Sequence, residues 1–329
     1  MKSMTSQEML EFLNIAQTIS PQDGAKKLEE WGTQRADVLV ALVQALRPKQ
    51  PLFERPEIVR DCCGTGGSGL ARLNTSTLVA FTAASLGRTV VKIGGRAASG
   101  RMGSVDLLEK IGLLEAANNL SFAAKLAKEK GLAFLSAPAC YPLLGALAPA
   151  RRMYGKRSVF NLAGPLLNPS LPNFQLIGVP AIEETYLEAI NELEISAWLV
   201  TSSTGLDDGI PGDTILVGSR RAPRVPDASE LNEALHEVKL EVRGFPKEKF
   251  FRSFDPTSDA MNILKGVGRL DLVTLVAWNA ALLLRITGEG TLSTSYTLAL
   301  DALRSGQVTS FFQNYIYAAD EVQTRCQTF

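Results

Sequence analysis

The sequence contains little histidine and little cysteine. His236 is the single histidine among 329 residues, and the four cysteines are Cys62, Cys63, Cys140 and Cys326. One histidine argues against catalysis by a serine–histidine pair and against a metal site with several histidine ligands. No C-x-x-C pair is present, so a disulfide framework is not expected and a reducing, cytoplasmic location is predicted.

Long apolar runs and an excess of one charge are also missing. The nearest approach to the roughly 18 apolar residues that span a bilayer is 270–288, which Asp271, Asn279 and Arg285 interrupt. The N-terminus has no continuous apolar segment, so no signal peptide is expected. Basic and acidic residues number 34 each, so no global field favours nucleic acid, and any anion must bind at a local site.

Short β-branched strands alternate with amphipathic helices through much of the chain, which predicts an α/β fold with a mainly parallel sheet. Ser121 is the expected N-cap of the helix predicted at 121–131. His236 directly precedes the strand predicted at 237–243 and belongs to the same alternating, strand-like run. Strands are predicted at 57–63, 89–93, 132–138, 174–180, 195–203, 214–218 and 237–243. Helices are predicted at 76–87, 105–112, 121–131, 181–194, 270–288, 293–306 and 308–322.

Two regions depart from this alternation. Residues 1–55 contain amphipathic helices and end in a proline-rich linker, and residues 140–172 contain several prolines and read as helix-rich, irregular chain. We therefore expect a small helical domain made of 1–55 with 140–172, and an α/β domain made of 56–139 and 173–329.

The segment DCCGTGGSGLARLNTST, residues 61–77, places a glycine-rich loop between a strand and a helix. Glycines let backbone N–H groups approach an anion, and the following helix N-terminus attracts it. Gly64, Gly66 and Gly69 also match the dinucleotide fingerprint G-x-G-x-x-G. However, LARLN delays the helix, and the next strand ends in VVKIGG without the acidic residue that binds ribose. The sequence therefore favours a phosphate-binding site that does not belong to a dinucleotide-binding fold.

A second small-residue loop, GGRAASGRMGS at 94–104, follows the next strand and contains Arg96 and Arg101. Lys92 lies in the strand that leads into it. Two anion-binding loops on adjacent strands indicate a ligand with two separated phosphate groups.

The segments DCCGTGGSG, NTST, VVKIGGR, GSVDLLEKIG, APARRMYGKRSVFNLAGPLLNP and GLDD occur in this order between Asp61 and Asp208. In order and spacing they resemble anthranilate phosphoribosyltransferases and, less closely, pyrimidine-nucleoside phosphorylases. The resemblance implies the two-domain fold above and a homodimer formed through the helical domain. It also implies displacement of pyrophosphate from phosphoribosyl pyrophosphate (PRPP) by the amine of anthranilate, in tryptophan biosynthesis, with Mg²⁺ on the diphosphate.

The same resemblance assigns roles to individual residues, because hard cations take oxygen ligands and a guanidinium grips a carboxylate. The implied PRPP-binding residues are Gly64, Thr65, Gly66, Gly67, Ser68, Asn74, Ser76, Thr77, Lys92, Arg96, Ser99 and Ser104. The implied metal ligands are Ser76, Asp207 and Asp208, and the implied acceptor-binding residues are Gly95, Tyr141, Arg151 and Pro165. No side chain is expected to act as a catalytic acid or base.

The sequence departs from the family pattern chiefly where the acceptor binds. Ser68 replaces an aspartate, Ile93 and Gly95 replace histidine and asparagine, and Tyr141 replaces a histidine. The metal pair is Asp-Asp rather than Asp-Glu. The phosphate-binding elements are kept, while hydrogen-bonding groups that face the acceptor are lost.

Two alternatives remain open. One is a phosphoribosyltransferase or nucleoside phosphorylase for another acceptor, although Arg151 favours an acceptor with a carboxylate. The other is a non-catalytic paralogue that binds nucleotides or nucleic acid. The basic runs RRMYGKR and SRRAPR are more typical of a solvated face.

Overall fold

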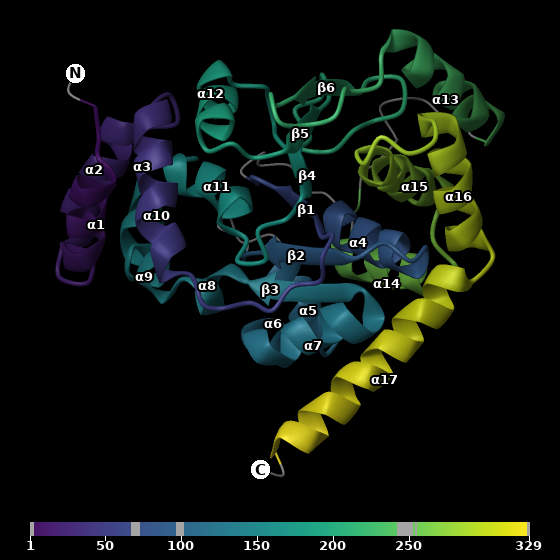
Figure 1. The fold of residues 1–329 in the computed structure, drawn as a ribbon, viewed down its shortest axis with the longest axis horizontal. Coiled ribbons are helices and arrows are strands. Elements are labelled where there is room, and N and C mark those ends of the chain that lie inside the picture. Colours follow the sequence, from purple (N-terminus) through teal and green to yellow (C-terminus); the bar gives the residue numbers. More distant parts are fainter. Residues whose placement is uncertain (1–2, 67–72, 97–101, 242–252, 254, 328–329) are drawn as a thin grey trace.

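The computed structural model describes residues 3–66, 73–96, 102–241, 253 and 255–327. Its centre is a six-stranded sheet with the order β3-β2-β1-β4-β5-β6 (Figure 1). The first five strands are parallel and β6 pairs antiparallel with β5, which confirms the predicted mainly parallel sheet. The strands are β1 (Arg60–Gly64), β2 (Val90–Gly94), β3 (Leu132–Ser136), β4 (Phe174–Gly178), β5 (Ala197–Thr201) and β6 (Ile215–Gly218).

Helices cover both faces of the sheet, so its central strands are buried on both sides and consist mainly of apolar residues, with Asp61 and Lys92 among the buried charged exceptions. One core includes Cys62 and Val90, and the other includes Cys63 and Val91, because neighbouring residues of a strand point to opposite faces. The first core includes residues of α4 (Thr75–Ser85), α13 (Ala228–Glu241), α14 (Pro256–Leu264), α15 (Leu270–Arg285), α16 (Leu292–Arg304) and α17 (Gln307–Gln327), and also residues of the three helices between β2 and β3.

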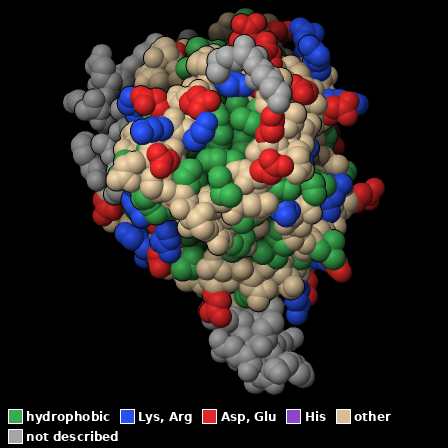
Figure 2. All heavy atoms as spheres, turned by 90° about the vertical axis from the view of Figure 1, so that its left-hand side faces the viewer, with side chains coloured by type: hydrophobic (Ala, Val, Ile, Leu, Met, Phe, Trp, Pro, Cys, Tyr) green, Lys and Arg blue, Asp and Glu red, His purple; other side chains and the backbone are tan. Residues whose placement is uncertain are grey.

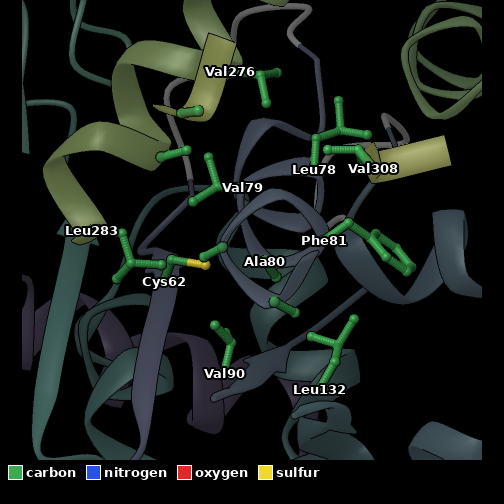
Figure 3. Packing of buried hydrophobic residues seen from close by; sticks show 14 of the residues in the cluster. Cys62, Leu78, Val79, Ala80, Phe81, Val90, Leu132, Val276, Leu283 and Val308 are labelled. Carbon is green, nitrogen blue, oxygen red and sulfur yellow. The ribbon is translucent and has the colours of Figure 1, made fainter. Parts of the chain in front are cut away.

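Helix α4 carries the start of the candidate site and is surrounded by apolar groups on every side. Figure 3 shows Leu78, Val79 and Phe81 of this helix among side chains from the sheet and from the C-terminal helices, such as Val90 and Val276. A helix buried all round has no solvated face, which explains its almost uninterrupted run of small and apolar residues. This packing fixes where its N-terminus lies.

The N-terminal helices pack against the helices of residues 137–163. Glycine permits the closest contact, between α2 and α10, because a Cβ on Gly24 would lie 2.6 Å from the Cβ of Ala150. The division into two domains at the expected boundaries stays a prediction. The N-terminal helices are α1 (Ser6–Ile15), α2 (Pro21–Trp31) and α3 (Ala36–Leu46), with η1 (Arg47–Lys49). Their partners follow β3: α8 (Ala137–Cys140), α9 (Pro142–Ala146), α10 (Ala148–Tyr154) and α11 (Val159–Ala163), then η2 (Gly164–Leu167).

The strand predicted at 237–243 is wrong, because residues 228–241 form α13 and His236 lies on this helix. Ala234 and Val238, four residues apart, are buried on the same face of α13, so a helical period overrides the short alternation. The predicted cap at Ser121 is also wrong. Asn119 caps α7 (Leu120–Lys130), since its side chain accepts a bond from the amide of Phe122 at 3.1 Å.

The remaining helices are α5 (Ser104–Lys110), α6 (Leu114–Asn118) and α12 (Glu184–Glu192). Helix α14 was not predicted at all. Within the described part of the chain, no helix combines the length and apolar character needed to cross a membrane.

Candidate functional site

The carboxyl ends of β1 and β4 form the centre of the candidate site. The chain builds β2 and β3 on one side of β1, then returns to place β4 and β5 on its other side. Ligands of open α/β sheets bind at such a topological switch point, because the loops diverge there and leave a crevice. Gly64 pairs in register with Gly178, and the amide of Thr65 donates to the carbonyl oxygen of Gly178 at 2.8 Å.

The loop that follows β5 reaches this crevice and brings the two predicted metal ligands with it. A Cβ on Gly178 would lie 1.9 Å from the backbone oxygen of Asp207, so only glycine allows this approach. Asp207 and Asp208 are buried, and Asp208 accepts a bond from the Thr75 hydroxyl at 3.0 Å. Ser76 and both aspartates line one small cavity, so the structure brings these three residues together, and their role as metal ligands stays a prediction.

The N-terminus of α4 presents buried polar atoms that have no hydrogen-bond partner among the described residues. Asn74 is the N-cap residue, yet its side chain makes no capping bond and its Nδ2 is buried without a hydrogen-bond partner. The hydroxyl of Thr77 is also buried and without a partner. Buried polar groups are nearly always paired, so these two atoms indicate a missing ligand or ordered water. Both were predicted to bind PRPP.

Lys92 organises the start of the second loop. Its side chain is fully buried, and its Nζ donates to the Ser104 hydroxyl at 3.1 Å and to the carbonyl oxygen of Ile93 at 3.2 Å. A Cβ on Gly94 would lie 2.7 Å from the Cβ of Ser104, so this glycine allows α5 to begin beside the end of β2. Lys92 and Ser104, twelve residues apart, are thus brought into contact as expected for one anion site.

Arg96, in the second loop, is already paired with carboxylates. Its guanidinium is half-exposed and bonds to Asp106 at 2.8 Å and to Glu109 at 2.7 Å, and these carboxylates raise its pKa. A phosphate would therefore have to compete with two carboxylates of α5 for this group. Its predicted role in PRPP binding remains a prediction, as do those of Gly67, Ser68 and Ser99, which lie outside the described residues.

Sequence reasoning missed a buried polar network beneath the two loops. Asn168, after η2, donates from its Nδ2 to Asp61 on β1 at 2.8 Å and to the carbonyl oxygen of Val91 on β2 at 2.7 Å. Burial raises the pKa of Asp61 to about 6, against the opposing effect of the positive charge of Lys92. This network joins the two strands that carry the phosphate loops. The GPLLNP segment was its only sequence signal.

The predicted acceptor-binding residues have largely apolar surroundings. Tyr141 is buried, its hydroxyl has no hydrogen-bond partner, and burial raises its pKa. Ile93 is also buried, whereas a Cβ on Gly95 would meet no atom within 4 Å. Pro165 lies in η2, which packs against β2. This edge of the site offers space and few polar groups.

Arg151 lies on α10, with its guanidinium 5.9 Å from the centre of the Phe160 ring. Burial lowers its pKa, and its guanidinium has no hydrogen bond or ion pair with a side chain of the described residues. A partly buried, unpaired guanidinium suits a carboxylate ligand. Tyr141 precedes α9 and Pro165 lies in η2, so the predicted acceptor-binding residues come from different elements.

A divalent cation would meet a sparse set of protein ligands here. No cluster of three or more histidine, cysteine, aspartate or glutamate residues suited to a metal occurs among the described residues. Asp207, Asp208 and the Ser76 hydroxyl supply oxygen atoms around one cavity. This set fits Mg²⁺, which takes one or two carboxylates and completes its shell with water and substrate phosphates.

Comparison with known proteins agrees with this geometry. Residues 56–309 match the family described as "Glycosyl transferase family, a/b domain". The anthranilate phosphoribosyltransferase of Synechococcus sp. (strain CC9902) is 38% identical over 282 residues, which are 82% of this chain and 78% of that protein. That of Aeropyrum pernix is 32% identical over 294 residues, with 88% and 84% covered.

Solved structures show the same similarity. The crystal structure of anthranilate phosphoribosyltransferase from Thermus thermophilus superposes with a TM-score of 0.80 at 28% identity, covering 97% of both chains. The Saccharomyces cerevisiae enzyme, solved in complex with PRPP and Mg, gives a TM-score of 0.76 at 21% identity, with 96% of this chain and 92% of that chain covered. The second match shows the shared fold alone.

Proposed function

Since the chain belongs to the anthranilate phosphoribosyltransferase family, we propose that it displaces pyrophosphate from PRPP with the amine of anthranilate, a step of tryptophan biosynthesis. The observation that carries the proposal is the crevice between β1 and β4. There the buried and unpartnered atoms of Asn74 and Thr77 lie at the start of α4, and the Asp207–Asp208 pair lines the adjoining cavity.

The chain's own residues bind and position the reactants. The backbone of the first loop and the N-terminus of α4 receive the diphosphate, and Lys92 with Ser104 holds a second phosphate. Arg151 grips the carboxylate of the acceptor and so aims its amine. In-line positioning of two reactants supplies much of the rate, which agrees with the lack of a catalytic histidine.

Mg²⁺ fits the oxygen atoms of Ser76, Asp207 and Asp208, and when bound it neutralises charge that develops on the leaving pyrophosphate. Thr75 fixes one of these carboxylates through its 3.0 Å bond to Asp208. The close approach at Gly178 fixes the other residue through its backbone.

A second candidate is transfer to a different aromatic acceptor that carries a carboxylate. It is favoured by the buried Ile93, the open space at Gly95 and the unpartnered hydroxyl of Tyr141. An apolar wall discriminates weakly between acceptors that differ in hydrogen-bonding groups.

Calorimetry and fluorescence distinguish the two candidates. We expect PRPP to bind in the presence of Mg²⁺, and anthranilate fluorescence to fall when both substrates are present. Binding of PRPP without consumption of anthranilate would favour the second candidate. Failure to bind PRPP with or without Mg²⁺ would contradict both.

We also propose a homodimer formed through the helical side of the molecule, in the reducing cytoplasm. Figure 2 shows hydrophobic side chains gathered in the middle of this side. Ile15 of α1 and Met153 of α10 are each about half exposed, and Cys62, Cys63 and Cys140 are free thiols. Light scattering tests the dimer. Met153→Lys should shift the protein toward monomers, and an unchanged mass would argue against this face.

A further inference from the structure

Arg157 contacts the start of the first phosphate loop from a distant part of the chain. It lies in the connection between α10 and α11, ninety-two residues after Thr65, and its Nη2 donates to the Thr65 hydroxyl at 3.1 Å. Thr65 is buried and lies at the switch point, where its amide bonds to Gly178. Its hydroxyl also donates to the Gly178 carbonyl oxygen at 3.4 Å, so Arg157 completes its hydrogen bonding.

Glu183 holds the other end of the guanidinium. This residue precedes α12, forms an ion pair with the Nη1 of Arg157 and accepts a bond from Gln34 at 3.3 Å. Gln34 belongs to the connection between α2 and α3. The side chains of Arg157 and Glu183 are only 17% and 15% exposed, so water screens the pair less than it screens a surface pair. A chain of contacts thus runs from the N-terminal helices to the first phosphate loop.

We infer that Arg157 is a positioning residue, set by Glu183, that holds Thr65, at the start of the first loop, in the position from which its backbone and hydroxyl receive the diphosphate of PRPP. This inference rests on the proposed function for its ligand, but the contacts themselves do not depend on it. A planar guanidinium suits this task, because one edge can bond to the hydroxyl while the other bonds to the carboxylate.

The basic run RRMYGKR, which contains Arg157, therefore does not form a uniformly solvated face as its sequence suggested. Within it, Arg151 lies over Phe160 and Arg157 faces the phosphate loop. Although only six positions separate these two arginines in the sequence, the fold gives them different contacts.

The test compares Arg157→Met, Arg157→Lys and Glu183→Gln with Arg221→Met. The last removes an arginine from the exposed pair with Glu194, whose side chains are 60% and 68% exposed. We expect Arg157→Met to raise KM for PRPP by about ten- to one hundred-fold, as expected for loss of a hydrogen bond from a charged donor. We expect a smaller change in kcat, partial rescue in Arg157→Lys, and wild-type values in Arg221→Met.

A double-mutant cycle ties the effect to the hydroxyl of Thr65. Thr65→Val should raise KM for PRPP about as much as Arg157→Met, and the double variant should add little. Thr65→Ser keeps the hydroxyl and should therefore raise KM for PRPP by less than Thr65→Val does. Fully additive effects of Arg157→Met and Thr65→Val would overturn the inference.

Hydrogen exchange provides a readout that needs no substrate. The Thr65 amide, bonded to Gly178, should exchange faster in Arg157→Met and Glu183→Gln than in the wild type and in Arg221→Met. Unchanged exchange at Thr65 together with unchanged KM would overturn the inference. If the wild type binds no PRPP, the proposed function fails, and the exchange rates alone decide whether Arg157 positions the loop.

Discussion

The two phosphate loops are held in different ways. At the first loop, after β1, contacts come from distant parts of the chain: Gly178 of β4, Asp208 near Thr75, and Arg157 on Thr65. At the second, after β2, the contacts of the described residues are mostly local, since Lys92 reaches Ser104 twelve residues on, and one long-range bond runs from the Thr257 hydroxyl of α14 to the sulfur of Met102. A loop held by distant segments depends on the whole fold, whereas a loop held by its own neighbours depends mainly on its own sequence.

The largest expected effect follows from breaking the crevice at the first loop. In Gly178→Ala the new Cβ would lie 1.9 Å from the backbone oxygen of Asp207, so the backbone must shift. We expect the free energy of unfolding to fall by about 3 kcal/mol and PRPP binding to be lost. Gly95→Ala, where a Cβ meets nothing within 4 Å, is the control and should change stability by less than about 0.5 kcal/mol. Equal losses of stability in the two variants in denaturant titrations would contradict this reading.

The second loop is broken by Lys92→Met, which removes the buried charge and keeps most of the volume. We expect PRPP affinity, measured by calorimetry, to fall by about ten- to one hundred-fold, because bonds from a charged donor to a phosphate are lost. Lys110→Met, at the exposed end of α5, should bind PRPP as the wild type does. Unchanged affinity in Lys92→Met would refute its role as a phosphate-binding group.

Asp61 lies on β1 beneath both loops, in the polar network with Asn168 that joins β1 to β2. The pH dependence of stability therefore reports on this network. The pKa of Asp61 is about 6 in the folded chain against an ordinary value of 3.8. Between these values the folded chain holds a proton that the unfolded chain has released, so this group's contribution to stability falls as pH rises from about 4 to about 6. Asp61→Asn removes the ionisable group and, with it, this loss of stability at higher pH. Relative to wild type, the variant should gain about 3 kcal/mol in unfolding free energy between pH 4 and pH 7.

Denaturant titrations at several pH values measure this difference, in which the titration of other groups largely cancels. A difference that does not change with pH would show that Asp61 is not strained by burial. A difference that falls as pH rises would reverse the assigned sign.

The smallest expected effect concerns the acceptor side of the second loop. Gly95→Asn restores the residue of the resembled family at a position with open space, so stability should change by less than about 0.5 kcal/mol. If anthranilate binds beside this loop, its KM should fall about two- to tenfold, as one neutral hydrogen bond allows. Gly95→Ala is the matched control. Similar KM values for the two variants would argue that position 95 does not face the acceptor.

Much of the parallel sheet could be predicted because each strand is a short apolar run bounded by turn residues. The prediction failed at 237–243, where residues that alternate locally belong to α13 and meet the core with a helical period. The phosphate loops could be located through their glycines and helix starts. Asn168 and Arg157 could not, because their partners Asp61 and Thr65 are 107 and 92 residues away.

The sequence by itself determined roughly where six of the strands lie, which loops are rich in glycine and which residues could bind an anion, since backbone preference and side-chain chemistry are local properties. Only the tertiary structure decided which of these groups are committed to other partners. It turned Arg96 toward two carboxylates of α5, left the Nδ2 of Asn74 and the hydroxyl of Thr77 without a hydrogen-bond partner among the described residues, and brought Arg157 to Thr65. A buried polar group is paired or free according to what the fold packs against it, and that is settled by residues far away in the chain.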